Sequence, residues 1–283
     1  AARILSRFVE DARLLDLLGN DTRWAIVGGA VRDCIVGKLE EFQRTLFVPW
    51  PDVDVAVASQ ALALPDSVAS LADRGYSLSV NSFGGWKVAL AEDGELDVWQ
   101  LPAAARGSLM AKGWADYLNR VDFSLNAIAF IWPEREVIFH PRWVAALRSR
   151  RIEKLAEDSP RGELQPVRAV ALCAKLTMLT GCKFRLGRRA GKDLKWLLTE
   201  CPDERRQEAV AYVREKTDSG RWPPDVLAAF FTRASASNDH PELLRRLADA
   251  AGLRSAGGRG PRKHRRTSMV ADMLWEMEVH APD

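Results

Sequence analysis

Two aspartates one residue apart, Asp52 and Asp54, are residues whose type and spacing indicate chemistry. Side chains two positions apart on a β-strand point to the same face, so these two carboxylates lie close together and repel each other. A pair of Mg²⁺ ions, held by the carboxylates together with substrate phosphates, is the usual compensation. The alternative is a solvated Asp-x-Asp on an edge strand or a loop.

A second group lies upstream, where Gly28 and Gly29 end an apolar run and open a helical pattern. In that arrangement free backbone N–H groups and the helix dipole receive a phosphate. Arg32 and Asp33 add a cation and a neighbouring carboxylate on the next turn. A Gly-Gly pair alone is equally compatible with a plain tight turn. The glycine spacings of a Walker loop and of a Rossmann fingerprint are both missing, which excludes these two classes.

The elements that must position these groups form an α/β unit. Apolar runs predict strands over 24–27 and 53–57, with a helix over 30–36 between them. The remaining patterns predict helices over 2–18 and 61–74 and strands over 77–80, 86–90 and 96–99. Two links between these strands are too short for helical crossovers, so the sheet is expected to be mixed or antiparallel.

Beyond about residue 145 the patterns become helical. Helices are predicted over 167–179, 192–198, 203–216, 224–231 and 241–251. Residues 254–266 hold six Lys and Arg residues and four Gly and Pro residues, which is typical of an exposed loop. We therefore expect two domains, 1–145 and 146–283.

Composition narrows the class of protein. The chain has 283 residues, of which 47% are hydrophobic and 28% are charged, so disordered and fibrous classes are excluded. No apolar run is long enough for a membrane span or a signal peptide. Four scattered cysteines indicate a reduced, cytoplasmic protein without a structural zinc site. Residues 1–140 carry a net charge of −6 (13 basic, 19 acidic), and residues 141–283 carry +9 (28 basic, 19 acidic).

Three segments then match one family in order: Ile26-Val-Gly-Gly-Ala-Val-Arg-Asp33, Asp52-Val-Asp54 and Arg120-Val-Asp-Phe-Ser-Leu-Asn-Ala127. They resemble the G-G-x-V-R-D, D-x-D and R-R-D-F-T-x-N-A signatures of the class II nucleotidyltransferases, the family of bacterial tRNA CCA-adding enzymes and poly(A) polymerases. The resemblance covers roughly residues 24–175. It implies an α+β fold, in which a polymerase-β-like nucleotidyltransferase head with a small mixed sheet precedes an all-helical neck and C-terminal domain.

The resemblance also implies roles for individual residues. Asp52 and Asp54 would hold two Mg²⁺ ions. Asp97 is either a third catalytic carboxylate or an ordinary surface aspartate. The implied nucleotide-binding residues are Gly28, Gly29, Arg32, Asp33, Arg120, Asp122, Asn126, Gln165 and Arg168.

The chain departs from the family pattern at several positions. Val121 replaces the second arginine of R-R-D, and Ser124 replaces the threonine. The family reads the base with an E-D-x-x-R motif, whose nearest match here keeps Arg168 but has Gln165 in place of the aspartate. An amide offers a donor as well as an acceptor, so the base preference of the family does not transfer.

The expected function is Mg²⁺-dependent transfer of a nucleoside monophosphate from an NTP, ATP or CTP, to the 3′-hydroxyl of an RNA, with tRNA as the first acceptor to consider. One alternative keeps the fold but modifies another RNA, a protein or a small molecule. The other is a degenerate RNA-binding member without catalysis. The basic segment 254–266 either contacts RNA or is a solvated loop. Most of the ten tryptophans are expected to pack in the core.

Overall fold

The computed structural model of the chain describes residues 6, 18, 23–36, 53–58, 71, 73, 75–80, 85–89, 95–101, 113–156, 164–180 and 182–218. Within the chain there are two compact units. The first comprises Ala1–Val121 and Leu125–Trp143, and the second comprises Asp122–Ser124 and Val144–Asp283. Asp52, most of the helices predicted over 2–18 and 61–74, the helices predicted over 224–231 and 241–251, and the basic segment 254–266 lie outside the described residues.

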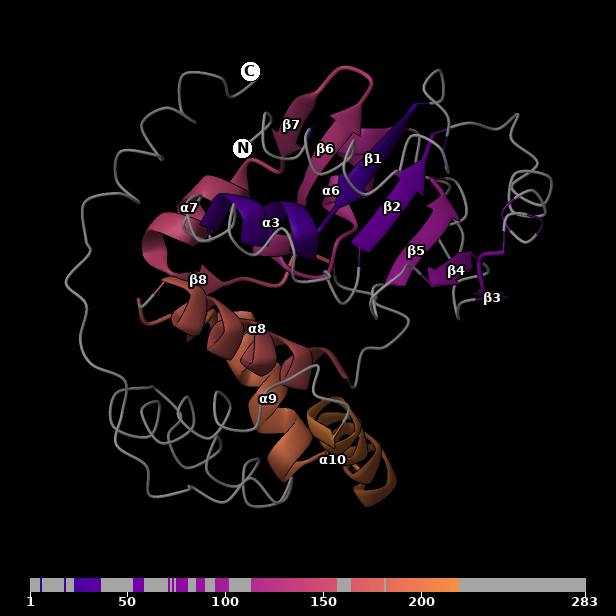
Figure 1. The fold of residues 1–283 in the computed structure, drawn as a ribbon. Coiled ribbons are helices and arrows are strands. Elements are labelled where there is room, and N and C mark those ends of the chain that lie inside the picture. The colour runs from indigo at the N-terminus through magenta and orange to yellow at the C-terminus, as the bar shows by residue number, and fades with distance from the viewer. Residues whose placement is uncertain are drawn as a thin grey trace. The chain divides into compact units, whose positions relative to one another are not determined.

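The first unit is built on a seven-stranded sheet with the order β3-β4-β5-β2-β1-β6-β7 (Figure 1). The strands are β1 (Trp24–Val27), β2 (Val53–Val57), β3 (Leu78–Val80), β4 (Trp86–Ala89), β5 (Glu95–Gln100), β6 (Ile128–Trp132) and β7 (Glu136–Phe139). The β2–β5 pair is parallel and the other pairs are antiparallel. The predicted mixed sheet is therefore confirmed.

The core of this unit lies at the middle of the sheet. All residues of β1 and β6 are buried, and the rings of Trp24 and Trp132 stack with their centroids 5.9 Å apart. Helix α3 (Gly29–Val36) packs against β1, β2 and β6, and α6 (Trp114–Asn119) packs against β6. Burial on both faces explains why β6 is continuously apolar and lacks the alternation that marks a half-exposed strand.

Helices make up most of the second unit. The elements from residue 124 onward, apart from the sheet strands, are η1 (Ser124–Asn126), α7 (Arg142–Ser149), β8 (Arg151–Ile152), α8 (Gln165–Thr180), β9 (Arg185–Leu186), α9 (Arg188–Thr199) and α10 (Asp203–Asp218). Helix α8 packs against α9 and against the β8–β9 pair. No described helix is long and apolar enough to cross a membrane.

The sequence patterns miss several elements of this fold, among them the helices α6 and α7. Strands β6 and β7 complete the main sheet but were not among the predicted strands. In the second unit, β8 and β9 form a two-residue parallel pair within a region that reads as helical. A strand of two residues is too short to produce a periodic signal.

Candidate active site

The turn between β1 and α3 is the centre of the candidate site. Gly28 has φ of 68°, in the left-handed region where glycine is favoured. Its N–H donates to Ile128 O (2.9 Å), and its carbonyl accepts from Arg32 N (3.0 Å), which starts α3. A Cβ built on Gly28 would lie 3.9 Å from Asp54 Oδ2. The carboxylate of Asp54 therefore lies beside the glycine turn.

Asp54 and Asp97 are direct partners in the parallel β2–β5 pair. Neighbouring strands lie roughly 4.8 Å apart, and residues in register project to the same face of the sheet. The aspartate that the sequence left open, Asp97, is therefore brought next to Asp54 although 43 positions separate them in the chain. Like charges in such positions are unfavourable unless a cation compensates for them.

Lys87 supplies part of that compensation. It is the register partner of Asp97 on β4, and its Nζ lies 3.6 Å from Asp97 Oδ2. It also forms an ion pair with Glu95. Lys87 was not among the residues singled out by the sequence, because its position opposite an aspartate depends on strand register.

The donor set of this group suits a hard cation, since it consists of carboxylate oxygens. Among the described residues no group of three or more His, Cys, Asp or Glu side chains is placed to hold a metal ion. Asp52, which the sequence puts one residue before β2, lies outside them. Asp54 and Asp97 are thus the described part of a carboxylate set that fits Mg²⁺.

Arg32 is fixed beside the same turn. It is only 3% exposed. Its Nε donates to Asp33 Oδ1 (2.7 Å), and its Nη1 donates to Asn126 Oδ1. A Cβ built on Gly29 would lie 3.5 Å from Arg32 Nη2, so the guanidinium folds back toward the glycine pair. Charge-assisted hydrogen bonds to a buried arginine are strong and hold it in one orientation.

Arg120 has a different environment from the rest of this group. Arg120 directly follows α6, and its Nη2 lies 3.0 Å from Oδ2 of Asp116, which stands four residues earlier in the first turn of that helix. Among the predicted residues of the first unit, the structure therefore gathers Gly28, Gly29, Arg32, Asp33, Asp54, Asp97 and Asn126 around the ends of β1, β2 and β5, and holds Arg120 on Asp116.

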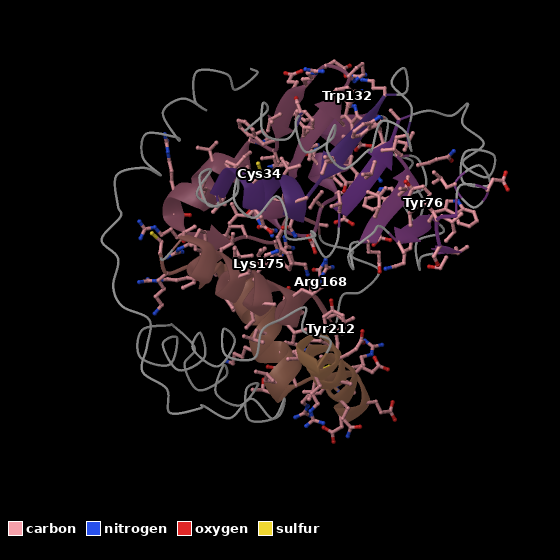
Figure 2. The ribbon with its side chains drawn as sticks, viewed as in Figure 1. Cys34, Tyr76, Trp132, Arg168, Lys175 and Tyr212 are labelled. Carbon is pink, nitrogen blue, oxygen red and sulfur yellow. The ribbon has the colours of Figure 1, made fainter. Side chains whose placement is uncertain are left out.

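The second unit holds the other three predicted residues. Asp122 Oδ2 lies 3.0 Å from Arg168 Nη1, and Asp122 Oδ1 accepts from Phe123 N (2.9 Å). Figure 2 shows Arg168 on α8. Gln165 begins α8 and lies three positions before Arg168, so the two share one side of the helix.

Gln165 is the least satisfied polar residue in the group. It is 1% exposed, and neither its Oε1 nor its Nε2 has a hydrogen-bond partner among the described residues. An unpaired buried amide costs about 1–3 kcal/mol. Such a group calls for a ligand or another compensation.

Cys34 and Cys173 are buried and are not nucleophiles. Burial raises the pKa of the Cys34 thiol, on α3, to about 12, and burial raises the pKa of Cys173 on α8 even further. Both therefore stay protonated at neutral pH, whereas a nucleophilic cysteine needs a lowered pKa. The described chemistry is that of carboxylates, arginines and backbone N–H groups.

Comparisons with known proteins give a fold. No family model and no curated protein matches the chain. A solved structure described as a tRNA-processing enzyme complex is 22% identical with a TM-score of 0.52, over 85% of this chain and 57% of its own. An apo form of a tRNA-processing enzyme is 17% identical with a TM-score of 0.50, and the match covers 98% of this chain and 78% of that enzyme's chain. A tRNA nucleotidyltransferase with a primer tRNA and an ATP analogue is 21% identical with a TM-score of 0.46, over 86% and 60%.

The matches with TM-scores of 0.52 and 0.50 are both below 25% identity, so they show the fold alone. The chain shares the fold of these two tRNA-processing enzymes, and its mixed sheet followed by helices confirms the predicted α+β fold class. It spans 57% of the length of the first of these structures.

Proposed function

We propose that this protein transfers a nucleoside monophosphate from an NTP to the 3′-hydroxyl of an RNA, with a tRNA 3′ end as the first acceptor to test. The observation that carries this proposal is the pairing of Asp54 with Asp97 beside a glycine turn that also holds a buried arginine. Carboxylates for metal ions and donors for phosphates are the two parts that phosphoryl transfer requires.

Each group of the first unit has a place in that reaction. The N-terminal turn of α3 and Arg32 receive the triphosphate. Asp33 and Asn126 hold the guanidinium in advance, so it needs no reorganisation when charge develops on the leaving pyrophosphate. When bound to Asp52, Asp54 and Asp97, two Mg²⁺ ions would activate the attacking hydroxyl and neutralise phosphate charge.

Recognition of the base falls to the second unit in this proposal. Gln165 has a buried amide whose donor and acceptor are both unpaired within the described chain. The edge of a nucleobase would satisfy both groups at once. Arg168, held by Asp122, would contribute further donors next to it. The domain division that accompanies this proposal is 1–145 for the head and 146–283 for the neck and RNA-binding region.

The test is to identify the transferred nucleotide and the acceptor together. The protein is incubated with Mg²⁺, total RNA and each labelled NTP in turn, and 3′ ends are sequenced. We expect nucleotides added at RNA 3′ ends, most of all on tRNA, and none with the matched variant Asp54→Asn. Label found on protein or on a small molecule would instead favour a different acceptor. Equal labelling by wild type and Asp54→Asn would refute the proposal.

A further inference from the structure

The second unit carries a row of exposed cations that none of the roles above uses. We name this row the basic strip. It consists of Arg150, Arg151, Arg185, Arg188, Lys192 and Lys195, and Trp196 lies at its end. In Figure 2, side chains tipped with nitrogen gather around the end of α8 that leads into β9.

The strip begins at the β8–β9 pair. Arg151 and Arg185 are register partners there, and Arg185 N donates to Arg150 O at 2.8 Å. Ile152, the next residue of β8, is fully buried, so the arginines project from the opposite, exposed face. Three guanidinium groups therefore start from adjacent backbone positions, two of them roughly 5 Å apart across the strands.

Helix α9 continues the strip. Arg188, Lys192 and Lys195 follow the i, i+4, i+7 spacing of one helix face, and all are exposed. The opposite face carries buried side chains such as Leu194 and Leu197. Trp196 is 39% exposed, which is unusual because Trp24, Trp114, Trp132 and Trp143 are buried. This helix thus presents cations and an aromatic ring to solvent together.

These positions are unfavourable for the stability of the protein alone. Arg150 has φ of 54°, a left-handed conformation in which glycine is normal at a helix end. Arg188 opens α9, whose first turn has no acidic residue, although a helix N-terminus disfavours cations. Arg151 faces Arg185 directly, which sets two like charges side by side. Several local rules broken in one place indicate a functional surface.

Four arginines of the strip, Arg150, Arg151, Arg185 and Arg188, have no ion-pair partner within the described ranges. Of the acids close in sequence, Asp193 pairs with Lys154 at 3.0 Å. The carboxylate of Glu153 lies against the backbone of Gly187, between Arg185 and Arg188, and is the one described acid placed within the strip.

Lys183, two residues before Arg185, has a pKa that is lowered by burial and then by the charge of Arg185. Both effects disfavour its ammonium form. The region therefore has a positive potential that a polyanion would relieve.

We propose that the basic strip binds the phosphate backbone of an RNA strand, with Trp196 stacking on one of its bases. Guanidinium groups bind phosphates in a bidentate manner, and an aromatic ring among cations suits a nucleic acid better than an acidic protein or a bilayer. Helix α9 alone is about 18 Å long, enough for several phosphates. The proposal rests on the proposed function in one respect, namely that the acceptor is RNA.

The test measures binding without catalysis. The full chain is titrated against a fluorescent, unmodified tRNA transcript in Mg²⁺ without NTP, at several salt concentrations. Each phosphate contact contributes about 0.7–0.9 to the slope of log affinity against log salt, or about five- to eightfold in affinity at 0.1 M salt. The double variant Arg185→Gln/Arg188→Gln is therefore expected to bind about 25- to 60-fold more weakly and to reduce the slope by about 1.4–1.8.

Three further variants separate contact from folding and charge from stacking. Arg150→Gly removes one phosphate contact, and glycine adopts the left-handed conformation at this position without strain. A weaker affinity of this variant for the transcript would therefore not result from unfolding. Trp196→Leu is expected to lose about fivefold or more in affinity with an unchanged salt slope. Arg205→Gln, an exposed arginine on α10 outside the strip, is the matched control and is expected to bind like wild type.

Wild-type affinity and slope in the double variant would overturn the proposal. So would equal, strip-dependent binding of poly-glutamate or of phosphatidylserine vesicles, which would mark a general anion surface. The outcomes are separable from those of the proposed function. Strip-dependent RNA binding without any nucleotide transfer would refute the proposed function only, and transfer to RNA with binding independent of the strip would refute this inference only.

Discussion

The charged residues of the candidate site in the first unit are held by partners within that unit, whereas four arginines of the basic strip, Arg150, Arg151, Arg185 and Arg188, have no ion-pair partner among the described residues. Arg32 is bound by Asp33 and Asn126, and Lys87 lies against Asp97. In the basic strip, by contrast, Arg151 and Arg185 stand side by side without a carboxylate among the described residues. The difference separates a preorganised site, whose groups must be in place before chemistry, from a surface that is completed only by its ligand.

The largest expected effect lies in the carboxylate pair of the first unit. Asp54→Asn and Asp97→Asn should each lower the rate of nucleotide transfer by about 10²- to 10³-fold or more, because each removes a charge that stabilises the transition state. Affinity for the tRNA transcript should stay within twofold of wild type, since the basic strip is intact. Steady-state rates of nucleotide transfer check the first expectation, and binding titrations on the same preparations check the unchanged affinity. Full activity in Asp97→Asn would make Asp97 an ordinary surface aspartate.

The next largest effect concerns the fold of the first unit. Asp33→Ala leaves the buried guanidinium of Arg32 without its carboxylate, so unfolding free energy should fall by about 3 kcal/mol. The matched control is Asp203→Ala, which breaks an exposed pair with Arg206 whose aspartate side chain is 82% exposed. That change should cost less than about 1 kcal/mol. Urea unfolding of both variants measures their free energies of unfolding. Equal losses of stability in the two variants would contradict the prediction.

A smaller effect, of opposite sign, is expected at Gln165. Gln165→Leu removes a buried amide that has no partner in the described chain, so stability should rise by about 1 kcal/mol. Discrimination among the four NTPs should fall at the same time, because the donor and acceptor proposed to read the base are lost. Gln207→Leu, an exposed change on α10, is the control for stability. A destabilised Gln165→Leu protein would show that the amide is satisfied in solution.

The smallest effect is expected at the start of the basic strip. Arg150→Gly should raise stability by about 0.5–1 kcal/mol, since glycine adopts φ of 54° without steric cost. Arg151→Gly, one residue later in a strand, should lower stability by a similar amount. Thermal unfolding of the two variants compares them directly. A loss of stability in both would mean that Arg150 is structurally required.

Much of the fold followed from local patterns. The strand–turn–helix from Trp24 to Val36 was predicted from an apolar run that Gly28 and Gly29 end, and the strand after Asp52 from valines that alternate with aspartates. Strand β6 is buried on both faces like β1, but no glycine turn bounds its apolar run, and an apolar run alone does not distinguish a strand from a buried helix. The β8–β9 pair was not predicted because a strand of two residues is too short to show a periodic pattern.

The candidate site divides in the same way. Gly28, Gly29, Arg32 and Asp33 are adjacent in the chain, so their spacing alone suggested a phosphate-binding turn. The role of Asp97 stayed open from sequence because nothing local distinguishes it from other surface acids. Strand pairing answers the question of position, since register places it beside Asp54. Lys87, which lies 3.6 Å from Asp97, is a neighbour that only strand pairing selects.

The sequence by itself determined the chemistry that this protein carries: the carboxylates, the glycine turn with its arginine, and the opposite net charges of the two halves of the chain. Only the tertiary structure decided which of these groups meet. It joined Asp54 to Asp97, folded Arg32 back onto the glycine turn, left the Gln165 amide unpaired and aligned the arginines of β8, β9 and α9. The physical reason is that residue type and local period are properties of neighbouring residues, whereas register, burial and pairing depend on residues far apart in the chain.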